Sequence, residues 1–145
     1  MESGTRIDFY ILAEAGQSSR LQFACRLTEK AYGQQHRVYA HATSDDEARE
    51  LDELLWTFRQ GSFIPHQLVS ESSDHRTPVR IGTPACADDS GQLLINLGPE
   101  APAFAGNFAR VAEIVDATDA SKDAGRERFR QYRAMGYNPV THKID

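Results

Sequence analysis

The run IDFYIL, at residues 7–12, is short, apolar and rich in β-branched and aromatic side chains, which predicts a buried β-strand. The residues GQSS, at 16–19, follow it as a turn and a helix start signal. Apolar side chains then recur at three- and four-residue spacing from about residue 20 to residue 34, the pattern of an amphipathic helix packed on a core. The chain therefore begins as a strand followed by a covering helix.

The same alternation continues along the chain. A second helix is expected in TSDDEARELDELLWTF because Ser44 and the acids after it suit a helix N-terminus. The further expected elements are a strand at 37–42, this helix at 43–58, strands at 79–83 and 93–97, a short helix near 103–108, a strand at 111–116 and a helix from about 121 to 135. The segment at 60–78 is predicted to be an irregular connection because Gly61, Pro65, Pro78 and several serines interrupt any period.

Strands that alternate with helices imply parallel pairs joined by right-handed crossovers. We therefore predict an α/β three-layer sandwich, a mostly parallel sheet with helices on both faces. A chain of 145 residues with 40% hydrophobic content fits one domain, 1–145. Cys25 and Cys86 have no neighbouring Cys or His pattern, so we expect two ordinary reduced thiols.

Charge is unevenly distributed in this chain, whose formal net charge is -5. Residues 121–145 carry six Lys/Arg and three Asp/Glu, whereas residues 1–120 carry ten and eighteen. A largely acidic body disfavours broad direct contact with DNA. Charged residues interrupt the first 25 positions, so we expect a cytoplasmic protein without a signal peptide or membrane span.

The loops after the strands offer little for catalysis. The residues AEAGQSSRLQ, at 13–22, contain one glycine and no lysine, so no nucleotide-binding loop of either common kind can be written there. The five histidines are scattered, and the acids at 45–47 are explained by a helix N-terminus, so we expect no metal and no cofactor. A small α/β enzyme or nucleotide-binding protein, acting at the strand ends near 13–18 and His41, stays open as the alternative.

A basic segment, GRERFRQYRAMG at 125–136, stands out against the acidic body. At 100° per residue, one arc of about 100° holds four cations and a ring, namely Lys122, Arg126, Phe129, Arg130 and Arg133. Arg128 faces elsewhere, and Asp123 and Glu127 flank the arc and neutralise it in part. Guanidinium forks beside an aromatic ring suit an acidic peptide that carries a hydrophobic residue. A solvated helix with Phe129 in the core, or direct binding of single-stranded nucleic acid through 122–133, are the alternatives.

A second feature is the aromatic cluster in LLWTFRQGSFIPH, at 54–66. The cluster comprises Trp56, Phe58, Phe63, Ile64 and Pro65. So many apolar side chains in an irregular loop exceed what a small core needs, and exposed clusters of this kind mark protein interfaces. The sequence supports an interface and a core position for this cluster equally, because a single Trp is also a common core residue.

These two segments carry a resemblance to a known family. LDELLWTFRQGSFIPHQL, at 51–68, followed by RERFRQYRAMGYN, at 126–138, resembles the chi subunit of bacterial DNA polymerase III, and the similarity extends over nearly the whole chain. The resemblance implies a Rossmann-like fold that binds no nucleotide. It also implies a noncatalytic accessory subunit of the replicative clamp-loader assembly, which reaches DNA only indirectly.

The family connects two partners. One is the acidic, phenylalanine-ending C-terminal tail of single-stranded-DNA-binding protein (SSB), and the other is the psi subunit or, in some bacteria, a helicase that competes for the same face. The resemblance places tail contacts on Lys122, Arg126, Phe129 and Arg130, to which the helical arc adds Arg133. It places the psi or helicase contacts on Trp56, Phe63 and Pro65. Phe129 stands where the family often has a tyrosine, and Gly125 costs the helix about 1 kcal/mol relative to Ala.

Overall fold

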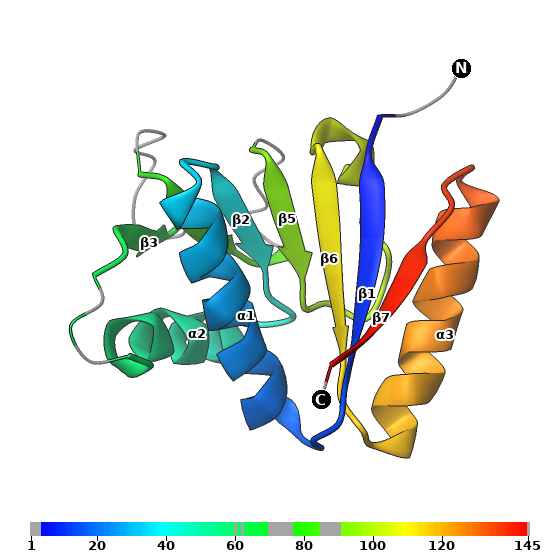
Figure 1. Cartoon of the computed structure of the whole chain (residues 1–145), viewed down its shortest axis with the longest axis horizontal. Helices are drawn as coiled ribbons and strands as arrows, with labels where there is room; N and C mark the ends of the chain where they lie inside the picture. The colour runs from blue at the N-terminus through cyan, green and yellow to red at the C-terminus, as the bar shows by residue number, and fades with distance from the viewer. Residues whose placement is uncertain (1–3, 60, 62, 70–76, 85–90, 145) are drawn as a thin grey trace.

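The computed structural model describes residues 4–59, 61, 63–69, 77–84 and 91–144 (Figure 1). Its elements are β1 (Arg6–Leu12), α1 (Gln17–Gly33), β2 (Val38–His41), α2 (Asp45–Thr57), β3 (His66–Leu68), β4 (Val79–Gly82), β5 (Leu93–Asn96), the 3-10 turn η2 (Ala105–Asn107), β6 (Arg110–Val115), α3 (Asp119–Ala134) and β7 (Val140–Ile144). Helices α2 and α3 begin at capping side chains, whereas α1 follows Gly16 without one. Ser44 Oγ accepts a hydrogen bond from the amide of Glu47 at 3.2 Å, and Thr118 Oγ1 accepts one from the amide of Ser121 at 3.2 Å.

The seven strands form one sheet in the order β3-β4-β2-β5-β6-β1-β7, and all strand pairs among the described residues are parallel. A parallel sheet must be covered on both faces, and the central strands β2, β4 and β5 are buried along their whole length. The predicted Rossmann-like α/β sandwich is therefore confirmed.

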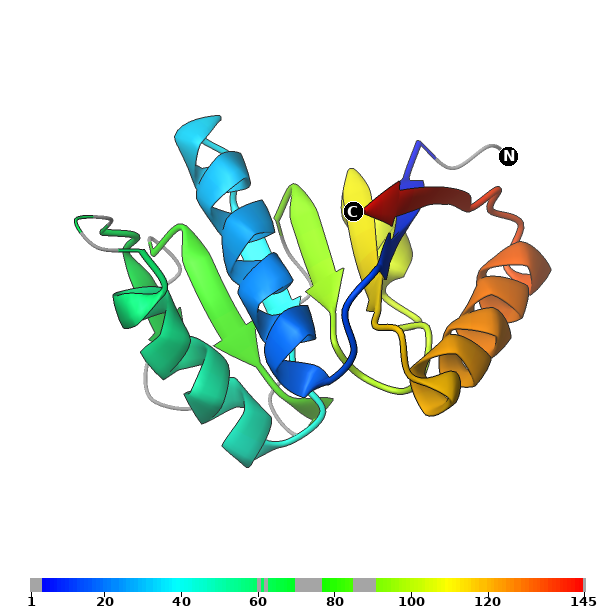
Figure 2. The ribbon, with the colours of Figure 1, turned by 60° about the horizontal axis from the view of Figure 1, so that its bottom comes forward.

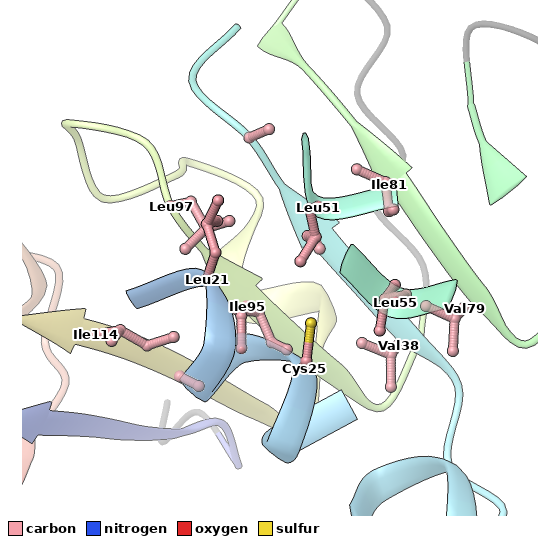
Figure 3. Packing of buried hydrophobic residues seen from close by; sticks show 14 of the residues in the cluster. Leu21, Cys25, Val38, Leu51, Leu55, Val79, Ile81, Ile95, Leu97 and Ile114 are labelled. Atoms are coloured by element: carbon pink, nitrogen blue, oxygen red, sulfur yellow. The ribbon is translucent and has the colours of Figure 1, made fainter. Parts of the chain in front are cut away.

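Helices α1 and α2 lie side by side over one face of the sheet (Figure 2). Leu21 and Cys25 of α1 and Leu51 and Leu55 of α2 pack against alternate residues of the strands below them. Figure 3 shows this layer, with Cys25 inside it. Burial raises the pKa of the Cys25 thiol to about 12, as expected of an unreactive core cysteine. Cys86 lies outside the described residues.

The opposite face carries a second core beneath α3. Phe9 of β1, Val111 and Val115 of β6 and Tyr132 of α3 are buried together there. The two cores are built from alternate residues of the strands, because successive side chains point to opposite faces of a sheet. Helix α3 runs beside β1 and β7 (Figure 1). Among the described residues, no helix is both long and apolar enough to cross a membrane.

Three local predictions are corrected by the structure. The segment at 60–78 is not wholly irregular, because His66–Leu68 form β3 at one edge of the sheet. The segment Val140–Ile144, for which no element was expected, forms β7 at the other edge. The short helix expected near 103–108 is a 3-10 turn of three residues. Both missed strands are short edge strands, where one partner strand supplies all the pairing and the hydrophobic pattern is correspondingly weak.

Candidate partner-binding site

Helix α3 is attached to the sheet by a buried ion pair. Arg128 Nε donates to Glu113 Oε1 at 2.6 Å, and both side chains are almost completely buried. Tyr132 Oη donates to Glu113 Oε2 at 2.6 Å, and Asn96 Nδ2 donates to the same oxygen at 2.7 Å. Burial raises the pKa of Glu113, and these three donors oppose that rise by stabilising the carboxylate. Because Arg128 points inward, the remaining cations of α3 are turned outward.

Gly125 brings α3 close to β6. A Cβ placed on Gly125 would lie 2.7 Å from Val115 Cγ2, which is too short for two carbon atoms. Glycine is therefore required by packing at this position, and this explains why the helix contains a residue that lowers its intrinsic stability. Gly125 and Val115 both line the groove beside α3.

A groove of about 490 Å³ lies between α3 and the sheet. It is lined by Phe9, Ile11, Val115, Lys122, Gly125, Arg126, Phe129, Arg130 and Thr141. The sheet supplies an apolar floor, and α3 supplies three cations along one side. Phe129 is half-buried and tilts against Phe9, with ring centroids 5.3 Å apart. The groove can hold an apolar group at its floor while the cations contact negative charge at its rim.

Two of these cations have partners on their own helix. Arg126 Nη1 donates to Asp123 Oδ1 at 2.7 Å, and Arg130 Nη1 donates to Glu127 Oε1 at 3.1 Å. The arginine side chains remain 65% and 73% exposed, and each of these hydrogen bonds uses a single guanidinium nitrogen. Exposed i,i+3 pairs contribute little, about 0.3–0.5 kcal/mol, so an incoming carboxylate can compete with them. The flanking acids therefore neutralise the arc in part, as the helical wheel predicts.

The structure brings most of the predicted tail-binding residues together. Lys122, Arg126, Phe129 and Arg130 line the groove. Arg133 is exposed in the last turn of α3 and does not line it. Within the described residues, Lys122 and Arg133 form no ion pair. The contiguous part of the predicted basic surface is thus the one from Lys122 to Arg130.

The aromatic cluster divides between surface and core. Trp56 is 52% exposed and Phe63 is 64% exposed, and their ring centroids lie 5.6 Å apart. Ile64, between them and the sheet, is buried, whereas Pro65 is half-buried. Two large rings in mutual contact on the surface form a hydrophobic patch of the kind that marks an interface. We call Trp56, Phe63 and Pro65 the aromatic surface.

The aromatic surface rests on a buried histidine. The ring of His66 lies 4.5 Å from that of Trp56, measured between centroids. His66 Nδ1 is 2.6 Å from the carbonyl of Ile64, and Nε2 is 3.0 Å from the carbonyl of Asp52. These contacts fix the ring between α2 and β3, so Trp56 packs on a rigid base.

Several groove residues were missed by the sequence interpretation. Phe9, Ile11 and Val115 belong to strands for which no binding role was predicted, and they line the groove beside α3. Thr141 was missed together with β7. The signal for β7 is the alternation of Val140, His142 and Ile144 with other residues after the Asn138-Pro139 turn. The signal for the ion pair is Glu113, an acid inside the apolar run VAEIVD.

Ligands in such folds usually bind at the carboxyl ends of the strands, and Arg20 of α1 lies at those ends of β5 and β6. Arg20 Nε donates to the carbonyl of Ile114 at 3.2 Å, and Nη2 donates to that of Leu97 at 3.3 Å. His41 is buried, its Nδ1 lies 2.9 Å from Tyr39 Oη, and burial lowers its pKa. In the described part of the chain, no group of three or more His, Cys, Asp or Glu could hold a metal ion.

Comparison with solved structures identifies relatives of the fold. A crystal structure of T4 UvsW superposes with a TM-score of 0.70 at 10% identity, over 98% of this chain and 42% of that one. Saccharomyces cerevisiae Dbp5, bound to Gle1 and IP6, superposes with a TM-score of 0.67 at 12% identity, over 100% of this chain and 43% of that one. At such low identity the likeness concerns the fold alone.

Comparison of sequences gives closer relatives. The DNA polymerase III subunit chi of Pseudomonas aeruginosa is 46% identical over 140 residues, which are 97% of each chain. The subunit of the same name in Haemophilus influenzae is 33% identical over 94% of this chain and 95% of its own, and that of Escherichia coli is 32% identical over 85% and 84%. Residues 4–140 match the family described as "DNA polymerase III chi subunit, HolC". The chain therefore belongs to the chi subunit family of DNA polymerase III.

Proposed function

We propose that this protein is a noncatalytic accessory subunit of the DNA polymerase III holoenzyme that connects SSB to the clamp-loader assembly. The groove under α3 takes the acidic, phenylalanine-ending C-terminal tail of SSB. The aromatic surface takes the psi subunit or a helicase. DNA is then reached through SSB, which agrees with the acidic charge of the first 120 residues.

The observation that carries this proposal is the composition of the groove. An apolar floor of Phe9, Ile11 and Val115 lies beside a row of cations on α3. A chain end that combines an aromatic side chain with carboxylates matches both parts. We expect the phenyl group of the tail to pack against Phe129 and the floor. Its terminal carboxylate and neighbouring acids would pair with Lys122, Arg126 and Arg130, replacing the weak bonds to Asp123 and Glu127. Arg133 would meet acids further from the chain end.

Binding through this groove should be modest and sensitive to salt. Each exposed charge pair contributes roughly 0.2–1 kcal/mol and is screened by ions. Burial of the phenyl group supplies a larger part, about 1.5–3 kcal/mol. Several tails on one SSB oligomer would raise the overall attachment without any new contact.

Isothermal titration calorimetry with a synthetic tail peptide tests the proposal. Arg126→Ala should weaken binding roughly two- to fivefold, because one exposed ion pair is lost. A peptide without its final phenylalanine should bind at least about tenfold more weakly. Arg49→Ala is the matched control, because Arg49 is an exposed arginine on α2, on the other face of the sheet. The proposal is wrong if the peptide does not bind, or if removal of its phenylalanine leaves the affinity unchanged.

A further inference from the structure

We infer that Lys143 of β7 forms a second basic wall of the groove, opposite α3, and contacts acidic residues of the bound peptide. The inference rests on the proposed function and extends it to a residue outside the basic helix. The groove would then hold an acidic chain between α3 and β7. With the cations of α3 alone, the chain would be contacted from one side only.

The strand register places Lys143 on the groove face. Strand β7 is parallel to β1, with Thr141 opposite Phe9 and Lys143 opposite Ile11. Directly paired residues of neighbouring strands point to the same face of a sheet. Phe9, Ile11 and Thr141 all line the groove. Lys143, two residues after Thr141 and beside Ile11, must therefore point to that face as well.

The residues that alternate with Thr141 and Lys143 in β7 point to the opposite face of the sheet. His142 Nε2 lies 2.8 Å from Asp8 Oδ1, and its ring stacks on Tyr10 with centroids 5.2 Å apart. Ile144 packs with the core under α1. Even-numbered residues of β7 thus face α1, and odd-numbered ones face α3 and the groove.

Lys143 and Lys122 flank the same end of the groove. Lys143 is paired with Ile11, close to the carboxyl end of β1. Helix α3 starts four residues after β6 ends, so its first turns also lie at the carboxyl ends of the strands. Lys122 belongs to those turns and lines the groove. A chain that leaves the groove at this end passes between the two lysines.

Charge and access both favour an acidic occupant at this end. The groove lining contains no Asp or Glu among the described residues. Lys143 is exposed and, in the described part of the chain, forms no ion pair. β7 is the edge strand of the sheet, so among the described residues no further strand covers this side (Figure 2). An uncompensated cation on either side of an apolar floor attracts a negatively charged chain and adds to the salt dependence of binding.

Charge reversal at Lys143 tests this wall. Lys143→Glu removes one attraction and adds a repulsion, so we expect the tail peptide to bind roughly fivefold or more weakly, with a smaller salt dependence. Lys143→Ala should give an intermediate loss. Arg49→Glu makes the same change of charge on α2 and should alter the affinity by less than about twofold, since α2 lies on the other face of the sheet. Thermal unfolding checks that each variant remains folded.

A second peptide separates this wall from the rest of the site. In this peptide the acidic residues are replaced by asparagine and the final phenylalanine is kept. The effect of Lys143→Glu should then disappear, because Lys143 has lost its partner. If wild-type protein binds the acidic peptide and Lys143→Glu behaves like Arg49→Glu, the second wall is wrong and the proposed function stands. If wild-type protein binds neither peptide, the proposed function itself fails.

Discussion

At the scale of single residues, two cations of α3 already pair with acids of their own helix. Asp123 and Glu127 occupy one nitrogen each of Arg126 and Arg130. Any tail carboxylate must displace them or share the arginine with them. The two acids therefore weaken the site, and they lower its positive potential as well.

Removal of these acids should strengthen tail binding. We expect Asp123→Asn combined with Glu127→Gln to raise the affinity for the tail peptide roughly two- to fivefold, because two weak competing ion pairs are lost. Calorimetry at low and moderate salt measures the effect. Glu50→Gln combined with Glu53→Gln, both exposed positions on α2, is the charge-matched control. Unchanged affinity in the double variant would mean that the tail does not contact Arg126 and Arg130.

Asp8 attaches the edge strand β7 to the sheet. Its buried carboxylate accepts hydrogen bonds from Arg6 at 3.0 Å, from Arg110 at 3.2 Å and from His142 at 2.8 Å. Burial alone would raise the pKa of Asp8, but the hydrogen bonds from His142, Arg6 and Arg110 outweigh burial and hold the pKa below its usual value. The ionised form is thus preferred more strongly in the folded chain than in the unfolded chain.

The lowered pKa of Asp8 makes part of the stability depend on pH. This contribution is complete above the unfolded pKa of about 3.9 and is lost as the pH falls through the folded value. Asp8→Asn should lower the free energy of unfolding at pH 7 by about 1–3 kcal/mol. The difference from wild type should shrink as the pH falls below about 4. Urea unfolding between pH 7 and pH 3 measures both, with Glu53→Gln as a control for the loss of an exposed acid. A constant difference over that range would contradict this account of Asp8.

At the scale of elements, two kinds of contact hold α3 on the sheet, namely apolar packing and hydrogen bonds to a buried carboxylate. Apolar packing of Tyr132 and Phe129 on Phe9 holds the helix against the sheet. The bonds from Arg128 and Tyr132 to Glu113 fix which side of the helix faces inward. The positions of Arg126 and Arg130 at the groove follow from this orientation.

A buried charge without its partner is costly, and this gives a prediction for α3. Arg128→Met leaves the carboxylate of Glu113 buried with two neutral donors, so we expect a loss of about 3–5 kcal/mol in unfolding free energy. Adding Glu113→Gln removes the orphan charge and should restore part of that loss. Denaturant unfolding of the single and double variants decides the matter. A double variant less stable than Arg128→Met would show that the ion pair does not act as described.

The central elements could be predicted from the sequence, and the edges could not. IDFYIL, VYAH and LLIN are largely apolar runs in interior strands of the sheet, and the helices that pack on them have regular apolar spacing. β7 is an edge strand with polar residues among its exposed positions, so its sequence lacks the continuous apolar run that indicates the central strands. The cations of the site followed from helical periodicity, because one helix carries them. The groove floor could not be predicted, because it depends on how α3 packs across the strands.

At the scale of the whole molecule, the two proposed surfaces lie on different parts of the fold. The groove is formed by α3, β1, β6 and β7 at one side of the sheet. The aromatic surface lies at the end of α2 and before β3, which is the opposite edge strand. Two partners could therefore bind at once, as a connecting subunit requires.

Separate surfaces should respond separately to mutation. We expect Trp56→Ala with Phe63→Ala to leave tail affinity within about twofold of wild type and to abolish binding of psi or a helicase, because distant sites are nearly additive. Arg126→Ala should do the reverse. Pull-down from cells of the source organism, combined with peptide calorimetry, measures both activities on the same variants. Loss of tail binding in the Trp56 and Phe63 variant would contradict the separation of the two surfaces.

The central claim is that an acidic chain end binds in the groove between α3 and β1 with β7. Its most direct test is titration of the isotope-labelled protein with the tail peptide, followed by the backbone amide signals in nuclear magnetic resonance spectra. We predict that the signals of Val115, Arg126, Phe129 and Thr141 shift together, while the indole signal of Trp56 stays in place. Shifts centred on Trp56 and Phe63, with the groove signals unmoved, would contradict the account.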